Sequence, residues 1–260
     1  MPFIVQPHTA REAQSLKDAL GASAAFIGGG TALQLAWGDE TPELILIDVA
    51  GLPEVQGIVL TGTRLRIGAG IRLESLRRDP FVLAHAPLLA AACDSLAALS
   101  VRHLATLGGN VGWRCGDTLA VLLVLDALAE LADGSTIPLA TWLTVNTSPL
   151  LVAVHIVADV ASPLAFFEKV GHRAAFSPTR LALAMHALRV DSKLVTVRVA
   201  ASAAGLPARR LHRVEQALEG LSLTQLERAS TATACAQDIS DPALARLACR
   251  LLHGHLAALV

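Results

Sequence analysis

Three consecutive glycines, Gly28 to Gly30, follow a short apolar run in the stretch AAFIGGGTAL, residues 24–33. Ordering three residues that lack a Cβ is entropically costly, so the fold must need this backbone for a close approach or for its N–H groups. Successive N–H groups in such a turn form a concave site for anions, and a helix that begins there adds the positive end of its dipole. A tight turn without a ligand is the alternative interpretation.

The turn does not fit the common nucleotide-binding signatures. Gly28 and Gly30 match the first two glycines of a Rossmann fingerprint, and Asp48 lies where a ribose-binding acid is expected. The third glycine position holds Leu33, however, and the helix that follows ends near Trp37, too early for a βαβ crossover. No Gly-Lys-Ser/Thr follows the glycines, which excludes a Walker A loop.

A second glycine-rich stretch, ATLGGNVG, lies about 80 residues further on. Its centre runs from Thr106 to Asn110, with a hydroxyl before two glycines and an amide after them. Two such turns can converge on the two phosphates of one dinucleotide. The pair of turns therefore favours a ligand-binding cleft over two unrelated loops.

The composition narrows the class of protein. The 260 residues are 53% hydrophobic and 17% charged with a formal net charge of -1, which is typical of a well-packed globular chain. There is no dense Lys/Arg cluster to suggest nucleic acid, no apolar run of the roughly 18 residues that span a membrane, and no secretory signal pattern at the N-terminus. The cysteines have neither iron–sulfur nor zinc spacing, so we expect no metal site and a reduced, cytoplasmic location. They are Cys93, Cys115, Cys235 and Cys249.

Hydrophobic periodicity predicts a small α/β opening, a mixed middle and an α+β tail. Thr9 and Glu12 form a capping-box pattern for a first helix that stops at Gly21, and Asp117 is expected to cap a later apolar helix. The predicted helices cover residues 9–20, 31–37, 73–77, 87–99, 117–127, 207–220 and 241–260. The predicted strands cover residues 24–27, 43–49 and 149–157 and two hairpins that turn at 61–63 and 191–193.

Six segments, in order and in spacing, resemble the FAD-binding medium subunits of molybdenum hydroxylases of the carbon monoxide dehydrogenase and xanthine dehydrogenase type. The resemblance covers essentially the whole chain and is densest between residues 7 and 180. The segments are FIGGGTALQL, PELILIDVAGLPEVQGI, LRIGAGIRLESL, SVRHLATLGGNVG, CGDTLAVLLVLDA and FFEKVGHRAAFS.

The resemblance implies an α+β fold. Its FAD-binding domain would have two subdomains, of the PCMH or vanillyl-alcohol-oxidase type, and a small α+β C-terminal domain would follow. We place the first subdomain at residues 1–52, the second at 53–163 and the C-terminal domain at 164–260.

The resemblance also implies FAD as the cofactor and a set of residues that hold it. Backbone N–H groups of the first glycine turn would wrap the pyrophosphate, and the second turn would complete that cradle. Asp117 would contact the ribityl or adenosine part, unless it is only a helix cap, and Lys169 would approach the flavin, unless it is a solvated surface residue. The cofactor-binding residues implied in this way are Ile27, Gly28, Gly29, Gly30, Thr31, Ala32, Thr106, Leu107, Gly108, Gly109, Asn110, Asp117, Leu150 and Lys169.

The implied function is electron transfer within a multi-subunit oxidoreductase. A [2Fe-2S] small subunit would deliver electrons to FAD on this chain, NAD or another acceptor would receive them, and a molybdopterin large subunit would carry the substrate chemistry. No catalytic residue is therefore expected here. A self-contained FAD oxidoreductase of the same fold superfamily and a structural subunit that has lost the cofactor remain as alternatives.

Three features depart from the family pattern. Ala32 stands where relatives usually carry an acidic or other polar residue, the segment between Asn110 and Asp117 is about two residues shorter than usual, and the chain contains no tyrosine. These changes leave the glycine backbone intact and bear on affinity for the cofactor.

Overall fold

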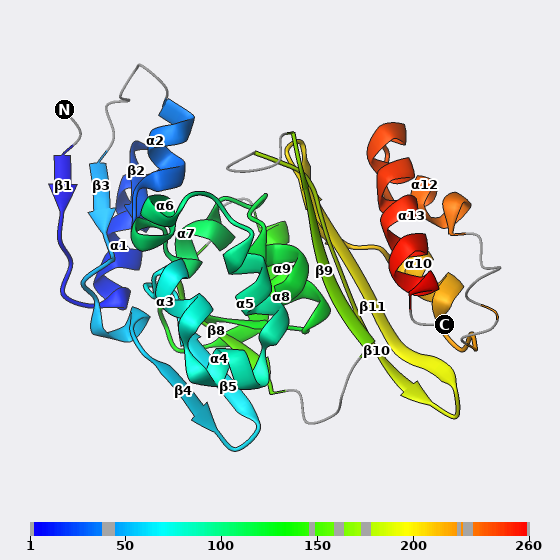
Figure 1. Cartoon of the computed structure of the whole chain (residues 1–260). Helices are drawn as coiled ribbons and strands as arrows, with labels where there is room; N and C mark the ends of the chain where they lie inside the picture. Colours follow the sequence, from blue (N-terminus) through cyan, green and yellow to red (C-terminus); the bar gives the residue numbers. More distant parts are fainter. Residues whose placement is uncertain are drawn as a thin grey trace.

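Three β-sheets follow one another along the chain (Figure 1). The computed structural model describes residues 3–37, 45–145, 149–158, 164–172, 178–222, 225 and 231–258. Figure 1 shows the N-terminal sheet at one end and helices of the C-terminal segment at the other, with a helical region between them.

The first sheet is parallel and has the order β1-β3-β2. Thr9 caps the helix that follows β1 by accepting a hydrogen bond from the Glu12 N–H at 3.1 Å, and the helix ends at Gly21 with φ of 55°, so this predicted helix is confirmed. The elements are β1 (Phe3–Val5), α1 (Ala10–Leu20), the 3-10 helix η1 (Gly21–Ser23), β2 (Ala24–Ile27), α2 (Thr31–Trp37) and β3 (Ile45–Asp48). The first two residues of the predicted strand 43–49 lie outside the described residues.

The second sheet is antiparallel and has the order β4-β5-β8-β6-β7. Its predicted hairpin is confirmed, with Gly62 at φ of 59° in the turn. The strands are β4 (Ile58–Thr61), β5 (Arg64–Gly68), β6 (Leu128–Leu131), β7 (Thr136–Pro138) and β8 (Leu151–Val157). The helices of this region are η2 (Pro53–Val55), α3 (Leu73–Arg78), α4 (Pro80–His85), α5 (Pro87–Asp94), α6 (Leu99–Leu104), α7 (Leu107–Gly112), α8 (Thr118–Val124) and α9 (Leu139–Thr144).

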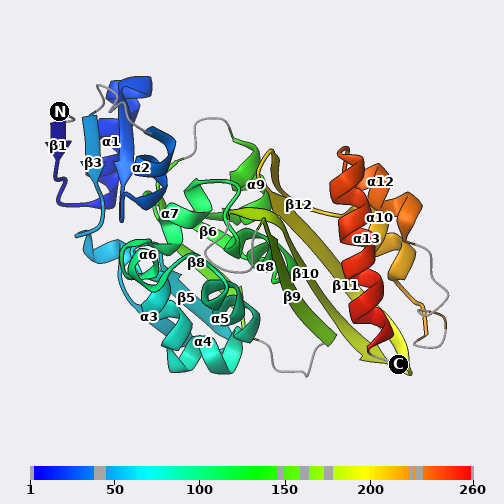
Figure 2. The ribbon, with the colours of Figure 1, turned by 45° about the horizontal axis from the view of Figure 1, so that its top comes forward.

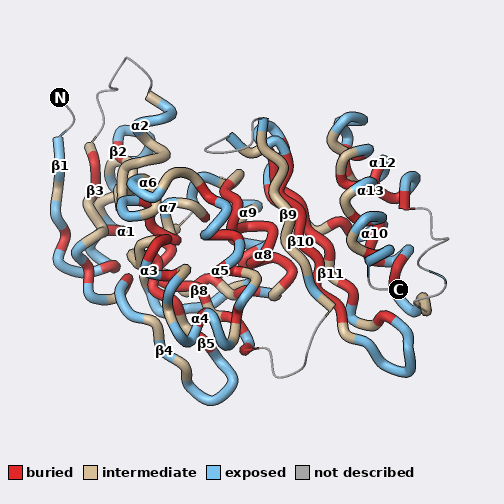
Figure 3. Tube along the Cα trace, in the orientation of Figure 1, coloured by how far each residue is buried: buried red, intermediate tan, exposed pale blue. Residues whose placement is uncertain are grey.

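The third sheet is antiparallel, has the order β12-β11-β10-β9, and is covered on both faces (Figures 2 and 3). One face packs on α8, every residue of which is buried, and the other packs on the C-terminal helices. The predicted hairpin between β10 and β11 is confirmed, with Asp191 and Ser192 in the left-handed region. The elements are β9 (Leu164–Gly171), β10 (Thr179–Val190), β11 (Lys193–Ala203), β12 (Leu206–Arg210), α10 (His212–Leu218), α12 (Ala232–Asp238) and α13 (Pro242–Ala257).

Three predicted elements differ in the structure. The predicted helix 87–99 stops at Asp94, because Ala97 has a φ of 46° and the chain turns there before α6. The predicted glycine turn at residues 106–110 is the first part of helix α7. The start of the predicted helix 207–220 is strand β12, and the helix begins only at His212.

The strands of each sheet come from a separate stretch of sequence. We propose that the three stretches correspond to domains with boundaries at 52/53 and 163/164.

A buried carboxylate, Glu74 of α3, joins α3 to α6. The Glu74 side chain is 3% exposed and accepts hydrogen bonds from Arg77 at 2.7 Å and from Arg102 at 2.9 Å. Arg78 pairs with the same carboxylate at 2.6 Å. Hydrogen bonds from Arg77 and Arg102, opposed by burial, lower the pKa of Glu74 from 4.5 to about 2.

Glu74→Gln should destabilise the protein by about 2 kcal/mol at pH 7, because the variant leaves partly exposed arginines without their charge partner. The carboxylate has a lower pKa in the folded chain than in the unfolded chain, so its contribution is full above pH 4.5 and disappears as the pH falls toward 2. Urea unfolding at several pH values measures this difference. We expect the unfolding free energies of wild type and variant to converge in acid, whereas a constant difference down to pH 2.5 would contradict the role of Glu74. The control is Glu12→Gln, at an exposed carboxylate of α1.

Candidate functional site

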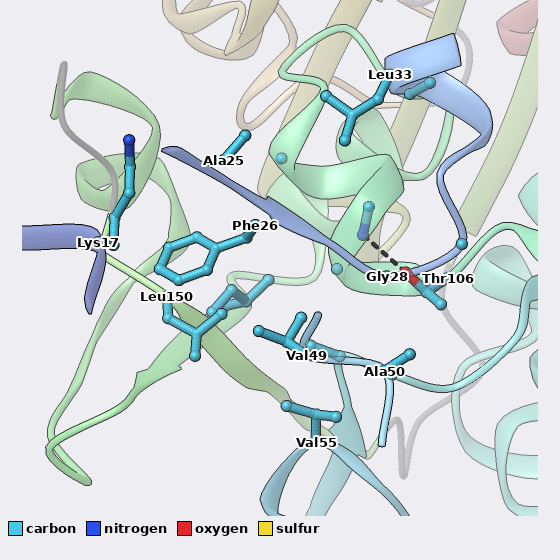
Figure 4. Close-up of a pocket in the computed structure, with 18 of the residues that line it drawn as sticks. Lys17, Ala25, Phe26, Gly28, Leu33, Val49, Ala50, Val55, Thr106 and Leu150 are labelled. Atoms are coloured by element: carbon cyan, nitrogen blue, oxygen red, sulfur yellow. Dashed lines mark hydrogen bonds between the residues drawn. The ribbon is translucent and has the colours of Figure 1, made fainter. Parts of the chain in front are cut away.

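A cleft of about 910 Å³ lies between the first and second sheets, within the size range of small-molecule sites. Figure 4 shows Thr106 beside Gly28, while Phe26, Val49, Val55 and Leu150 gather in the neighbouring part of the cleft. The lining residues are Gln14, Lys17, Asp18, Gly21, Ala22, Ala24, Ala25, Phe26, Gly28, Gly29, Gly30, Thr31, Ala32, Leu33, Val49, Ala50, Val55, Ala69, Gly70, Thr106, Gly108, Gly109, Gly112, Trp113, Trp142, Pro149, Leu150 and Leu151.

The first glycine turn is pressed against a second segment of backbone. A Cβ on Gly29 would lie 1.9 Å from the carbonyl oxygen of Leu104, and a Cβ on Gly28 would lie 2.9 Å from Oγ1 of Thr106. Gly30 has a φ of 71°, which only glycine adopts without strain. Packing within the protein therefore accounts for all three glycines, as the ligand-free alternative required.

The same turn nevertheless presents unused donors. Within the described part of the chain, none of the N–H groups of residues 28–31 donates to a protein acceptor. The carbonyl of Gly30 accepts from Gln34 N–H at 2.9 Å, so α2 begins directly at the turn and its first N–H groups are unsatisfied. Gly28 to Thr31 line the cleft, so these donors are available to an anionic group there.

The second glycine stretch differs, because its N–H groups are already used. Leu107 N–H donates to Ile71 O at 2.9 Å and Gly108 N–H donates to Ala69 O at 2.7 Å. Gly109 N–H donates to Oγ1 of Thr106 at 3.0 Å, which makes Thr106 the N-cap of α7. A Cβ on Gly108 would meet the Cβ of Ala69 at 2.8 Å. Close packing against Ala69 and Thr106 therefore accounts for these two glycines, and the stretch offers the cleft no free donors.

Nine of the predicted residues line the cleft together, and five lie elsewhere. The nine are Gly28, Gly29, Gly30, Thr31, Ala32, Thr106, Gly108, Gly109 and Leu150. The five outside the lining are Ile27, Leu107, Asn110, Asp117 and Lys169. Leu107 is fully buried in the core. Ile27 ends β2, where its carbonyl accepts from Val49 N–H at 2.9 Å.

The side chain of Asn110, and not that of Asp117, caps helix α8. The Asp117 side chain does not cap α8, so the predicted cap is wrong. Asn110 takes that role, since its Oδ1 accepts from the N–H of Thr118 at 3.2 Å and from the Thr118 hydroxyl at 2.6 Å. Asn110 can reach α8 because Gly116, whose Cβ would lie 2.3 Å from this oxygen, leaves space for it.

Asp117 instead joins α8 to the third sheet. Its side chain accepts a hydrogen bond from Lys169 Nζ on β9 at 2.6 Å and another from the hydroxyl of Thr179 on β10. Lys169 also donates to the carbonyl of Ser95 at 3.2 Å. Both charged side chains are nearly buried, so Lys169 is not the solvated surface residue of the alternative interpretation.

Aromatic side chains of the cleft were not predicted from the sequence. Phe26 lies on β2, two residues before Gly28, and Trp113 follows α7. Trp142 is 3% exposed and is held by a hydrogen bond from its Nε1 to Pro149 O at 3.1 Å and by the Arg114 guanidinium 5.7 Å from its ring centre. Only their proximity to glycine-rich segments could have indicated Phe26 and Trp113, and Trp142 carries no local signal.

The described residues contain no group of three or more His, Cys, Asp or Glu side chains that could hold a metal ion. Among the same residues, no helix is long and apolar enough to cross a membrane.

Comparison with known proteins places these observations in a family. The sequence profile described as "FAD binding domain in molybdopterin dehydrogenase" matches residues 2–165. A putative xanthine dehydrogenase FAD-binding subunit of Escherichia coli K12 is 36% identical over 89 residues, which is 33% of this chain and 30% of that protein. The carbon monoxide dehydrogenase medium chain of Hydrogenophaga pseudoflava is 36% identical over 107 residues, which is 40% of this chain and 37% of that protein. The matched part thus spans about a third of these curated relatives.

The fold itself is shared over nearly the full length. A solved structure of Hydrogenophaga pseudoflava carbon monoxide dehydrogenase, which lacks the Mo-pyranopterin moiety, aligns with a TM-score of 0.84 over 96% of this chain and 94% of that chain at 24% identity. Quinoline 2-oxidoreductase from Pseudomonas putida 86 aligns with a TM-score of 0.79 over 99% of this chain and 97% of that chain at 19% identity. The predicted α+β fold of the PCMH type is confirmed at this level.

Gly28→Ala should destabilise the chain by about 1–2 kcal/mol, because the new methyl group displaces the Thr106 hydroxyl and breaks the α7 cap. Thr106→Ala alone should lose about 1 kcal/mol. The double variant should lose less than the sum of the two, since the methyl group then meets no hydroxyl. Urea unfolding of the four proteins tests this coupling.

Gly51→Ala, where a Cβ meets nothing within 4 Å, is the matched control and should be neutral or slightly stabilising. Strictly additive losses at Gly28 and Thr106 would show that the two segments do not depend on each other.

Proposed function

Because the chain belongs to the family of FAD-binding domains of molybdopterin dehydrogenases, we propose that it is the electron-transferring FAD subunit of a multi-subunit molybdenum hydroxylase. A [2Fe-2S] subunit would supply the electrons, and NAD or another acceptor would receive them. A molybdopterin subunit would carry out the oxidation of the substrate. Membership in the family implies FAD as the cofactor, whereas the partner subunits and the electron acceptor are proposed.

One observation carries the assignment of the cleft to FAD: four successive N–H groups, from Gly28 to Thr31, line it without a protein acceptor in the described part of the chain. A pyrophosphate is the group that such donors and the start of α2 fit best. On the wall formed by α7, a Cβ on Gly112 would meet no atom within 4 Å, which leaves room for a bulky ligand. The residues present therefore fit the cofactor that the family implies.

The predicted binding residues divide into two groups under this proposal. The cleft-lining residues would contact FAD directly: the first turn through its N–H groups, the second through its open backbone, and Leu150 through apolar contact. Ala32 offers no polar side chain, so backbone donors would supply the polar contacts at this wall. Ile27, Leu107, Asn110, Asp117 and Lys169 would position the walls, because each is engaged with the protein in the core or through its own hydrogen bonds.

Bound FAD would supply the redox chemistry by accepting and releasing electrons one or two at a time. The residues of this chain orient and bury it. The Asp117–Lys169 ion pair would hold β9 and β10 against the start of α8. Trp142, Phe26 and Leu151 would exclude water from the apolar part of the cleft.

The purified chain should show a flavin absorption spectrum, and heat should release FAD that mass spectrometry identifies. The isolated chain should not oxidise a molybdenum-hydroxylase substrate such as xanthine, because it has no molybdopterin subunit. Substrate turnover by the isolated chain would favour the self-contained oxidoreductase instead. No flavin after incubation with excess FAD would favour the structural subunit that has lost the cofactor.

Gly112→Leu tests the cleft without disturbing the fold. Gly112 lines the cleft and a Cβ there meets no atom within 4 Å, so a larger side chain occupies open space beside the ligand. We expect FAD affinity to fall by about tenfold or more, equivalent to the loss of one good contact, with an unchanged unfolding midpoint. The control is Gly254→Leu, at an equally open helical glycine on α13 outside the cleft. Equal FAD affinity in the two variants would contradict this location of the site.

A further inference from the structure

A small hollow of about 180 Å³ lies between the start of β10 and helix α13, and shares no residue with the cleft. Arg180 of β10 and Arg246 and Arg250 of α13 line it, together with Ala243 and Leu247. Arg246 and Arg250 are one helical turn apart and therefore lie on the same face. Three guanidinium-bearing residues thus surround one hollow that is otherwise lined by apolar side chains.

A β-bulge directs Arg180 to this place. Along β10, Leu181, Leu183 and Met185 belong to the core under the C-terminal helices, whereas Ala184 belongs to the core on the α8 side. Continued alternation would send Arg180 to the α8 side.

The register shifts at this point, however, since Thr179 pairs with Gly171 and Leu181 pairs with Val170. Arg180 is the extra residue on β10. A bulge changes the direction of a side chain relative to the alternation of the strand. Arg180 thus lines the hollow beside α13, whereas the hydroxyl of its neighbour Thr179 donates a hydrogen bond to Asp117 on the α8 side.

No counter-charge for the three arginines lies within the described residues. None of their guanidinium groups makes a hydrogen bond or an ion pair with a described residue. Two other arginines of the third sheet do have acidic partners. Arg198 pairs with Asp126 at 2.6 Å, and Arg210 pairs with Asp126 at 2.7 Å and with Glu215.

The nearest carboxylate along α13 is also committed elsewhere. Asp241 accepts from the N–H groups of Ala243 and Leu244 at 2.7 Å and 3.0 Å as the helix cap, and no Asp or Glu occurs between Pro242 and Ala257. Like charges one helical turn apart are mildly destabilising, so an unliganded hollow of this kind opposes folding slightly.

We propose that this hollow binds a phosphate-sized oxyanion. The planar guanidinium forks match the oxygens of a phosphate group and bind it through charge-assisted hydrogen bonds. The volume is below the roughly 300 Å³ at which pockets for whole small molecules begin. The site therefore takes a single anionic group, as free phosphate or as the phosphoryl end of a larger molecule that stays outside.

The proposal is tested by isothermal titration calorimetry, in which inorganic phosphate is added to the full chain in the presence of saturating FAD. FAD is added so that the glycine turn does not contribute a second phosphate site. We expect one saturable phosphate site whose affinity falls by about tenfold or more in Arg246→Gln and in Arg250→Gln, and likewise in Arg180→Gln. Adenosine monophosphate should bind with similar affinity if the hollow accepts phosphoryl groups of larger molecules, and more weakly if it accepts only free phosphate.

Two further measurements keep the proposal falsifiable. Arg209→Gln, at an exposed arginine of β12 outside the hollow, should bind phosphate like the wild type. Without phosphate, Arg250→Gln should unfold at the same or a slightly higher temperature, because the variant removes a repulsive pair. Equal phosphate affinity in all four variants, or an equal response to chloride at matched ionic strength, would overturn the site. Binding of a hexaglutamate peptide but not of phosphate would show instead that the arginines serve a partner chain.

Discussion

The cleft depends on one steric contact, the approach of the Gly29 backbone to the carbonyl oxygen of Leu104. No side chain fits between the two, since a Cβ would lie 1.9 Å from that oxygen. The contact joins the turn after β2 to the end of α6, two segments that are distant in sequence. Because α7 begins directly after this point, the same contact fixes where the opposite wall of the cleft starts. The contact thereby sets how closely the turn after β2 approaches the second region beside the cleft.

The two glycine-rich segments resemble each other in sequence but contribute differently. Residues 28–31 keep their N–H groups free within the described structure, whereas the N–H groups of residues 107–110 are all spent inside the protein. A phosphate would therefore accept hydrogen bonds from residues 28–31 and none from the N–H groups of residues 107–110. Because these N–H groups are not needed for a ligand, residues 107–110 can form the first turn of α7, with Thr106 buried as its cap.

Much of the fold could be predicted because its signals are local. The Thr9 cap with Gly21 at the helix end and the hairpin turns at Gly62 and at Asp191 depend only on neighbouring residues, and the resemblance in six segments identified the family. Two of the misassignments involve partners that are distant in sequence. Asp117 occupies a capping position, yet Lys169 and Thr179 draw its carboxylate toward the third sheet, and Asn110 caps α8 instead. Likewise, residues 107–112 form a helix because carbonyls of residues 69 and 71 accept its first N–H groups, which no local pattern in the glycines reveals.

Helix α8 has a consequence for the architecture of the whole chain. All seven of its residues are buried, and it contacts β10, β11 and β12 as well as α5 and α9. Ala184 and Ala200 of the third sheet belong to the same hydrophobic core as Trp142 and Leu150, which line the cleft. Removing the segment after residue 163 would therefore strip one side of α8 bare and expose an uninterrupted apolar helix to water. The sheet of the C-terminal region is therefore a structural support for the preceding part of the chain, because it covers one side of α8 and completes its core.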